Sequence, residues 1–207
     1  FNQFYDDFES TEAWRYGAAV NQKFSRTVFG GVEYSQRDLD VPFQAQGAIG
    51  SALTAFIRDW HEKSGRAYLF WTPHDWVSLT AEYQYERSSR GAILNFGIQN
   101  VETQRIPLGL NVFHPSGLGL SIRPTYIHQQ GSFQNQNAAT PCCESGKENV
   151  WTVDAGLSYR MPDRYGLFTV GARNLFNENF QFQETDLHNP TVSPKRLFFM
   201  QLTLALP

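Results

Sequence analysis

The fold is decided by one stretch near the end of the chain, Trp151-Thr152-Val153-Asp154-Ala155-Gly156-Leu157-Ser158-Tyr159-Arg160. Apolar and polar residues alternate through it without a break. The apolar set is Trp151, Val153, Ala155, Leu157 and Tyr159, and the other set is Thr152, Asp154, Gly156, Ser158 and Arg160. Successive side chains of a β-strand point to opposite faces, so this stretch predicts a strand with one apolar and one polar face. About ten residues is also the length with which a tilted strand crosses a bilayer.

The residues that follow continue the pattern. The segment 162–165 predicts a tight turn, and Phe168, Val170 and Ala172 resume the apolar face after it. The chain closes on a further alternating run, 198–206. Its apolar face holds Phe198, Met200, Leu202, Leu204 and Leu206. The end of the chain therefore predicts a hairpin and a final strand.

Composition excludes several classes of protein. The 207 residues are only 18% charged and 15% aromatic, and the net charge of −3 offers no basic surface for nucleic acid. No apolar run approaches the ~18 residues of a membrane helix. The negative mean hydropathy normally indicates a soluble protein, but half of each strand of a membrane barrel faces water, so this criterion does not apply to such barrels. The only two cysteines, Cys142 and Cys143, are adjacent and give no disulfide framework.

The rest of the chain predicts more hairpins of the same kind. We expect nine strands, at 13–24, 28–37, 66–71, 77–86, 105–112, 118–129, 151–160, 168–173 and 198–206. Short turns at 25–27, 72–75, 114–117 and 162–165 alternate with long loops at 38–65, 87–101, 129–149 and 175–195. Outer-membrane barrels have short turns on the periplasmic side and long loops outside. Pro124 lies inside a predicted strand and predicts a bulge or a weaker strand, because proline cannot donate to the ladder.

These patterns predict an all-β protein, an antiparallel up-and-down transmembrane β-barrel. We expect residues 1–207 to be one barrel segment without a separate plug or soluble domain. Bacterial single-chain barrels have even strand numbers, and sheet edges cannot stay open in lipid. Nine strands therefore predict at least one more, either upstream of Phe1 or within 38–65. The sequence starts Phe1-Asn2-Gln3, without a Met and without the pattern of a signal peptide, so we expect either a processed chain or the tail of a longer polypeptide. With the short turns in the periplasm, the C-terminus would be periplasmic and the protein would lie in the bacterial outer membrane.

Aromatic residues fall at the ends of the predicted strands, where membrane barrels carry interfacial girdles. The predicted girdle residues are Trp14, Tyr16, Phe24, Tyr34, Tyr83, Tyr85, Tyr126, Trp151 and Tyr159. A soluble β-barrel or sandwich also alternates, with its apolar face inward. Strand length, loop asymmetry and the girdles favour the membrane over this alternative. So does the position of the arginines, because those on clean strands fall on the polar face.

The last hairpin carries a family resemblance. The run Val170-Gly171-Ala172-Arg173-Asn174-Leu175-Phe176-Asn177-Glu178-Asn179-Phe180, a loop, and then Pro194-Lys195-Arg196 before the final strand resemble the C-terminal end of TonB-dependent outer-membrane receptors. In that family an Asn-Leu-Phe on the penultimate strand precedes an aromatic, and a Pro-Arg pair opens the last strand. Here a lysine separates the pair. The hairpin at 67–85 also resembles hairpins of this family.

The resemblance implies a barrel of about 22 strands, an N-terminal plug and energy-coupled import of a scarce ligand. It also implies a TonB-type energy transducer or other subunits of an outer-membrane complex as partners, besides the outer-membrane lipid. The chain departs from the family in having no plug, no TonB-box and no terminal aromatic, since Ala205-Leu206-Pro207 ends it. Barrels fused to periplasmic helical repeats, which serve export, have similar final strands. The direction of transport, import or export, therefore stays open.

A mixed set of charged residues occupies the polar faces of the predicted strands and would face the lumen. The set is Arg15, Lys23, Glu33, Arg37, Glu82, Glu86, Arg105, Arg123, Asp154, Arg160 and Arg173. These residues would either contact a polar solute or a plug, or form cross-strand charge pairs on a hydrated wall. For any single residue the pairing role is favoured, and Asn174 and Arg196 are expected to fix the last hairpin.

Other reactive residues give no recognisable site. Cys142 and Cys143 could form a vicinal disulfide or bind a soft metal, but no histidine or further cysteine lies near them in sequence. The five histidines have no ligand spacing, and the acidic clusters at 6–9 and 38–40 are best explained as solvated loops. No nucleophile motif or phosphate loop is present. We therefore expect no enzyme activity, no cofactor and no metal.

Three functions stay open. The favoured one is a transport barrel that passes a polar solute across the outer membrane, for import or for export. The second is a barrel that serves as a non-conducting surface scaffold. The third is a soluble β-barrel that binds a ligand.

Overall fold

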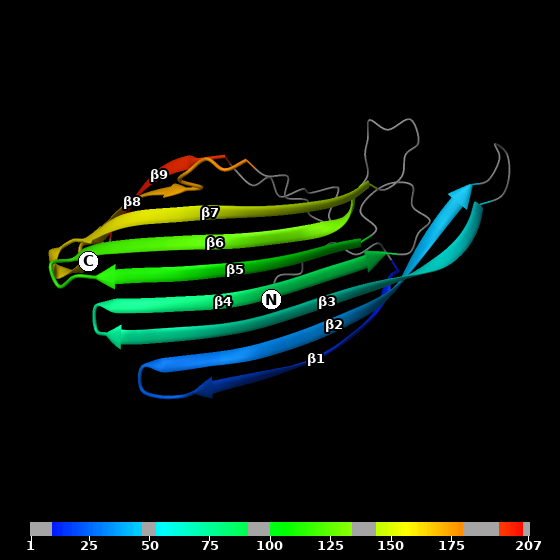
Figure 1. Ribbon diagram of the computed structural model, residues 1–207, viewed down its shortest axis with the longest axis horizontal. Helices are drawn as coiled ribbons and strands as arrows, with labels where there is room; N and C mark the ends of the chain where they lie inside the picture. Colours follow the sequence, from blue (N-terminus) through cyan, green and yellow to red (C-terminus); the bar gives the residue numbers. More distant parts are fainter. Residues whose placement is uncertain (1–9, 47–52, 91–99, 134–143, 180–194, 205–207) are drawn as a thin grey trace.

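The chain folds into a single curved, antiparallel β-sheet. The computed structural model describes residues 10–46, 53–90, 100–133, 144–179 and 195–204, and within them the nine strands follow one another across the sheet as a meander (Figure 1). The predicted all-β meander of nine strands is therefore confirmed. The strands are β1 (Glu12–Lys23), β2 (Val28–Gln46), β3 (Leu53–His74), β4 (Val77–Arg90), β5 (Asn100–Phe113), β6 (Leu118–Phe133), β7 (Glu144–Arg160), β8 (Gly166–Arg173) and β9 (Leu197–Leu204).

Four tight connections lie at one end of the sheet, which we call the turn end. At the first, the Ser25 hydroxyl accepts hydrogen bonds from the backbone N–H groups of Thr27 and Val28, at 3.2 and 3.0 Å. Another needs a glycine, because Gly117 has φ +92°, which side chains rarely adopt. The last contains the short 3-10 helix Pro162–Arg164. The opposite end of the strands, the loop end, joins the segments outside the described residues (Figure 1).

The strands at the loop end are longer than the sequence predicted. Residues 38–65 were expected to form a loop, yet β2 continues to Gln46 and β3 starts at Leu53. The expected loops at 87–101 and 129–149 are shortened in the same way by β4 to β7. The error has a physical cause: the face of β2 that is apolar as far as Tyr34 becomes polar beyond it, with Gln36, Asp38 and Asp40, while the backbone ladder to β3 continues. The expected turn at 72–75 is likewise displaced, since β3 runs to His74.

The prolines interrupt the ladder without a bulge. Pro107 of β5 is paired with Thr125 of β6, and the next ladder pair is Leu110 with Ile122. Three residues separate the pairs on both strands, so the register is the same before and after the gap. Pro124 lies within the gap on this side and is paired with Val153 of β7 on the other. The predicted bulge at Pro124 is wrong, because the neighbouring strands hold the register across one missing donor.

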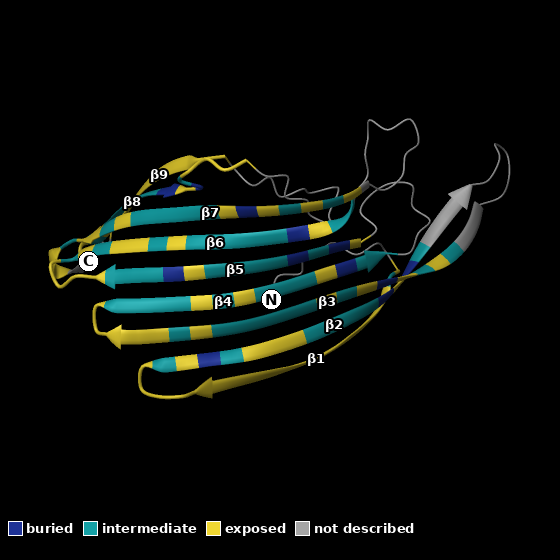
Figure 2. Ribbon diagram, viewed as in Figure 1, coloured by how far each residue is buried: buried dark blue, intermediate teal, exposed yellow. Residues whose placement is uncertain are grey.

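The sheet is open within the described residues, and β1 and β9 are its edges. Both edges lie further from the viewer than β4 to β6, so the sheet curves (Figure 1). Few side chains are buried: among the described apolar residues these are Leu39, Val41, Trp60, Val101, Val150 and Ala172 (Figure 2). A sheet with so small a core exposes most of its apolar side chains on its surface.

Candidate functional site: the two faces of the sheet

The predicted lumen-facing residues all lie on one face of the sheet, which we call the charged face. Residues that oppose each other across antiparallel strands share a face, and the strand register links the whole set through such pairs. Arg15 opposes Arg37, Arg123 opposes Asp154, and Glu86 opposes Thr103. Lys23, Arg160 and Arg173 oppose Phe29, Leu167 and Leu197 near strand ends. That this face lines a lumen stays a prediction.

Arg66 is the centre of an ionic network on the charged face. Its guanidinium donates from Nη2 to Glu82 Oε2 at 2.9 Å and lies 3.7 Å from Glu33 Oε1, so it joins β2, β3 and β4. Gln84 Nε2 donates to the same Glu82 oxygen at 3.3 Å. The guanidinium carbon also lies 4.7 Å from the centre of the Tyr68 ring, within cation–π range. Arg66 was not among the predicted residues, because its strand is apolar on both faces in sequence.

A second ion pair lies closer to the loop end on the same face. Arg37 Nη1 is 3.3 Å from Glu62 Oε2, and both side chains are more than four-fifths buried. Two residues closer to the turn end than this ion pair, the hydroxyls of Ser35 and Ser64 are 2.9 Å apart. The predicted residue Arg37 thus forms a cross-strand charge pair, which is the role that was favoured for these residues. Its partner Glu62 fell in a stretch that was assigned to a loop.

The turn after β8 is held by Asp154 and Asn174. The backbone N–H of Asn174 donates to Asp154 Oδ1 at 2.9 Å, and the Asn174 side chain bonds the backbone of Glu178 through both its oxygen and its nitrogen. Further along, the Arg196 backbone N–H donates to Asn177 Oδ1 at 3.1 Å. Asn174 is buried and has φ +47°. The Asn174 side chain therefore fixes the turn after β8, as the sequence predicted, whereas Arg196 contributes its backbone N–H to this hairpin.

The loop end of the charged face also holds a small packed cluster that the sequence analysis missed. Leu39 of β2 opposes Trp60 of β3, and Arg90 of β4 places its guanidinium carbon 4.4 Å from the Trp60 ring centre. Further along the sheet, Gln129 donates to the Thr103 hydroxyl at 3.0 Å in a buried contact. Alternation of Leu39 and Val41 with aspartates was the available signal, and the loop assignment hid it.

The opposite face, which we call the apolar face, carries most of the exposed large apolar side chains. Trp14 of β1 is 73% exposed and Met200 of β9 is 72% exposed, so apolar side chains are exposed on both edge strands. The predicted girdle residues that belong to strands, Trp14, Tyr16, Tyr34, Tyr83, Tyr85, Tyr126, Trp151 and Tyr159, all share this face by register. Phe24 lies in the turn after β1 and is exposed. The apolar side chains between the girdle residues form a continuous belt across the nine strands.

The belt crosses the sheet obliquely. One row of directly opposed residues on the apolar face can be followed by register through eight strands, over Val28, Trp71, Leu79, Leu110, Ile122, Ala155, Ala172 and Phe198. Every member is apolar. The row starts at the first residue of β2, at the turn end, and finishes near the first residue of β9, at the loop end. Across these eight strands the belt therefore moves along the strand direction by a distance about equal to its own height.

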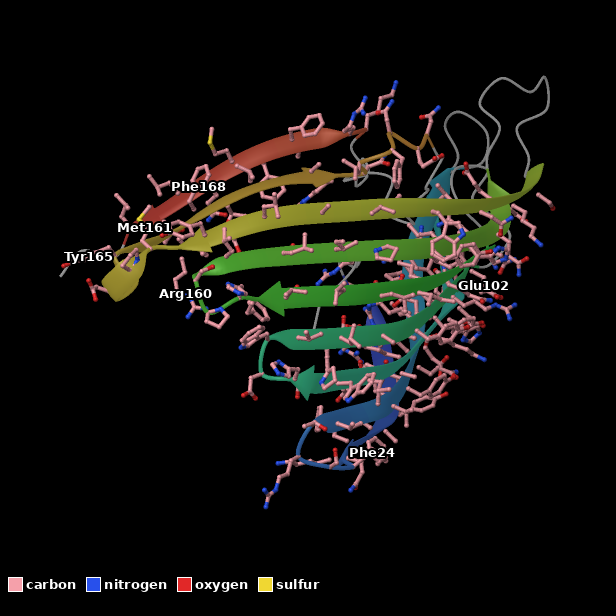
Figure 3. The ribbon with its side chains drawn as sticks, turned by 60° about the vertical axis from the view of Figure 1, so that its left-hand side comes forward. Phe24, Glu102, Arg160, Met161, Tyr165 and Phe168 are labelled. Atoms are coloured by element: carbon pink, nitrogen blue, oxygen red, sulfur yellow. The ribbon has the colours of Figure 1, made fainter. Side chains whose placement is uncertain are left out.

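The apolar face becomes polar beyond the belt at the loop end. Asp38 Oδ1 lies 2.8 Å from His61 Nδ1 and accepts from Gln36 at 2.9 Å, and the Tyr16 hydroxyl donates to Asp38 Oδ2 at 3.1 Å. The hydrogen bonds from Gln36 and then His61 hold the pKa of the Asp38 carboxyl below its ordinary value. Figure 3 shows this difference between the two ends: Glu102 lies among polar side chains at the loop end, and Tyr165 and Phe168 lie at the turn end.

In the described ranges, no group of three or more His, Cys, Asp or Glu side chains is placed to hold a metal ion. No helix in these ranges has the length and apolar character needed to cross a membrane. Cys142, Cys143 and the acidic residues at 6–9 lie outside the described residues.

Comparison with known proteins gives no match. No family model, no curated protein and no solved structure matches the chain. The resemblance to TonB-dependent receptors therefore stays a prediction that rests on the residues of the last hairpin.

Proposed function

We propose that the sheet is part of the wall of a transmembrane β-barrel in a bacterial outer membrane, with its apolar face towards lipid and its charged face towards a polar lumen. The observation that carries this proposal is the oblique apolar belt. Strand tilt explains it, because a flat slab of lipid cuts tilted strands at a level that moves along each successive strand. The belt moves by about one residue, ~3.4 Å, for each ~4.8 Å strand spacing, which corresponds to a tilt of about 35°. Membrane barrels tilt by about 35–45°.

The dimensions of the belt support the same assignment. From Trp151 to Tyr159 the belt spans about 27 Å along the strand at ~3.4 Å per residue. Tilted by about 35°, this gives a height of about 22 Å, close to the apolar band of about 25 Å in outer-membrane barrels. Across nine strands the belt covers roughly 1,000 Å², well above the 300–600 Å² of the largest apolar patch on a typical soluble monomer. Such a surface requires a cover, and lipid provides one of the right height.

Within this barrel we propose that the charged face serves passage of a polar solute. The support is its mixture of ionised side chains along β2 to β4, where Arg37, Glu62, Arg66 and Glu82 line one face. The resemblance of the last hairpin to TonB-dependent receptors favours import of a ligand, and export through a barrel coupled to periplasmic repeats is the alternative. The turn end would then be periplasmic, together with the C-terminus.

The proposal is tested in two steps. Membrane insertion predicts a band on a gel that migrates differently before and after boiling, and fractionation with the outer membrane. A monodisperse protein in water without detergent would refute it. Passage of solute predicts ion conductance in planar bilayers whose selectivity changes in Glu33→Gln/Glu82→Gln, and not in Lys63→Gln/Arg87→Gln on the opposite face. Insertion without conductance would contradict transport and favour a scaffold.

A further inference from the structure

Two positive charges face each other on the apolar side of the sheet, just beyond the belt. Lys63 of β3 is directly opposite Arg87 of β4, and both are exposed. Like charges in this position destabilise a sheet. The ion pairs of the described residues include neither side chain, whereas Arg66 and Arg37 on the charged face each have a carboxylate. An anion from outside the chain would relieve the repulsion.

A hollow marks the position of this pair. It has a volume of ≈ 320 Å³ and is lined by Gln36, His61, Lys63, Arg87 and Ser89. All five lie on the apolar face by register and come from three adjacent strands. The lining holds two permanent cations and three hydrogen-bonding side chains, and no carboxylate. The two cations of the lining are complementary in charge to a phosphate group.

The nearest carboxylates lie beside the hollow. Asp38 is held by the Tyr16 hydroxyl and by Gln36 and His61, so these two lining side chains already bond a carboxylate. Glu102 of β5 is opposite Arg87 and accepts a hydrogen bond from Gln104 Nε2 at 3.0 Å. Glu102 is therefore a competitor for the same cation, and its removal should strengthen anion binding.

The position of the hollow identifies the source of the phosphate. Lys63 and Arg87 lie two residues, about 7 Å, beyond Gly65 and Tyr85 on the same face, so they sit immediately above the belt. Gly65 separates Tyr34 from Tyr85 across the strands, and a side chain built there would find its nearest atoms 3.9 Å away. With Ala67 next on this face, the strip below the hollow has only small side chains, which leaves room for an acyl chain.

We propose that this surface binds the phosphate headgroup of a membrane lipid, whose acyl chain lies over Gly65 and Ala67. The inference rests on the proposed membrane barrel. Lys63 and Arg87 hold the phosphate, and the Ser89 hydroxyl supplies a further hydrogen bond. Removal of two basic residues from a membrane surface should lower the affinity for an anionic lipid roughly thirtyfold.

The test measures retention of dimyristoyl phosphatidic acid by the detergent-purified protein in native mass spectrometry. Lys63→Gln/Arg87→Gln should weaken binding roughly thirtyfold, Gly65→Val should weaken it several-fold without a change of charge, and Glu102→Gln should strengthen it. The matched control Arg26→Gln/Lys147→Gln removes the same charge from the first turn and from β7, and should bind like the unchanged protein.

Three results would overturn the proposal: unchanged binding in Lys63→Gln/Arg87→Gln, an equal loss in the control, or displacement of the lipid by the same concentration of inorganic phosphate. Heat-modifiable migration of each variant is recorded in parallel. If the unchanged protein migrates as a barrel but the lipid result is negative, only the lipid site fails. If barrel migration is absent, the proposed function fails as well.

Discussion

An arginine in the middle of the apolar belt should destabilise the protein strongly. Ala81 of β4 lies halfway between Val77 and Tyr85 and opposes Leu69 and Leu108 on the apolar face. If this face contacts lipid, Ala81→Arg places a charge near the bilayer midplane, which costs about 2–4 kcal/mol. The same arginine at Val77, at the edge of the belt, should cost only about 0–1 kcal/mol.

The matched control is the neighbouring residue on the same strand. Thr80 opposes Phe70 and Gly109 on the charged face, where Thr80→Arg would meet water and the small Gly109. We expect a loss below about 1 kcal/mol, as for most exposed substitutions. The assay is urea unfolding of the protein refolded into phospholipid vesicles. With a slope of about 1–3 kcal/mol per molar urea, Ala81→Arg should lower the midpoint by about 1–2 M relative to Thr80→Arg. Equal midpoints, or an equal loss at Val77 and Ala81, would refute the assignment of the two faces.

Three further predictions address the ionic network, the last hairpin and the topology. Arg66→Met should lower the free energy of unfolding by about 1 kcal/mol, because Glu33 and Glu82 then face each other without a cation; in urea unfolding, adding Glu82→Gln should restore part of this loss, and a further loss would contradict the network. Asn174→Ala should cost about 2–3 kcal/mol through the two lost side-chain hydrogen bonds to the Glu178 backbone and a positive φ, while Asn174→Gly should cost about 1 kcal/mol less because glycine adopts this φ freely; equal midpoints would refute the role of φ. In a Cys142→Ser/Cys143→Ser background, a large maleimide added to whole cells should label Ser89→Cys at the loop end and not Ser116→Cys in the turn, and the reverse pattern would invert the proposed topology.

The fold was predictable where side-chain polarity alternates. In 151–160 and 77–86 each residue alone shows which face it occupies, and the register agrees with both assignments. The predicted charged residues all share one face for the same reason. The stretch 66–71 could not be assigned from sequence, because Tyr68 and Phe70 are as apolar as Leu69 and Trp71. Only the register shows that Tyr68 is opposite Glu82. Arg66 is on the same face as Tyr68, so it can reach Glu82 and form the centre of the network.

The candidate lipid site could not be predicted, because all of its residues except Gln36 fell in stretches that were assigned to loops. Gln36, His61, Lys63 and Ser89 lie beyond the belt, where the face that is apolar within the belt becomes polar. Their strands persist because backbone pairing needs no apolar side chain when polar partners oppose each other, as Asp38 does His61. Across-strand neighbours such as Lys63 and Arg87 are 24 positions apart in sequence (87 minus 63), so their proximity is set by register alone.

The borders of the belt, rather than its hydrophobicity, carry the argument for lipid. Strand lengths vary from 8 residues in β9 to 22 in β3, yet the belt keeps a similar height on the strands where both borders are visible. An apolar surface that packed against a second sheet would follow the outline of that sheet, and the described strands all belong to one sheet. A border that ignores strand ends and shifts by about one residue per strand is what the proposed flat slab of lipid would leave on tilted strands. In the proposed barrel the aromatic residues at that border and the cation pair just beyond it would lie at the level of the lipid headgroups, so one geometry supports both proposals.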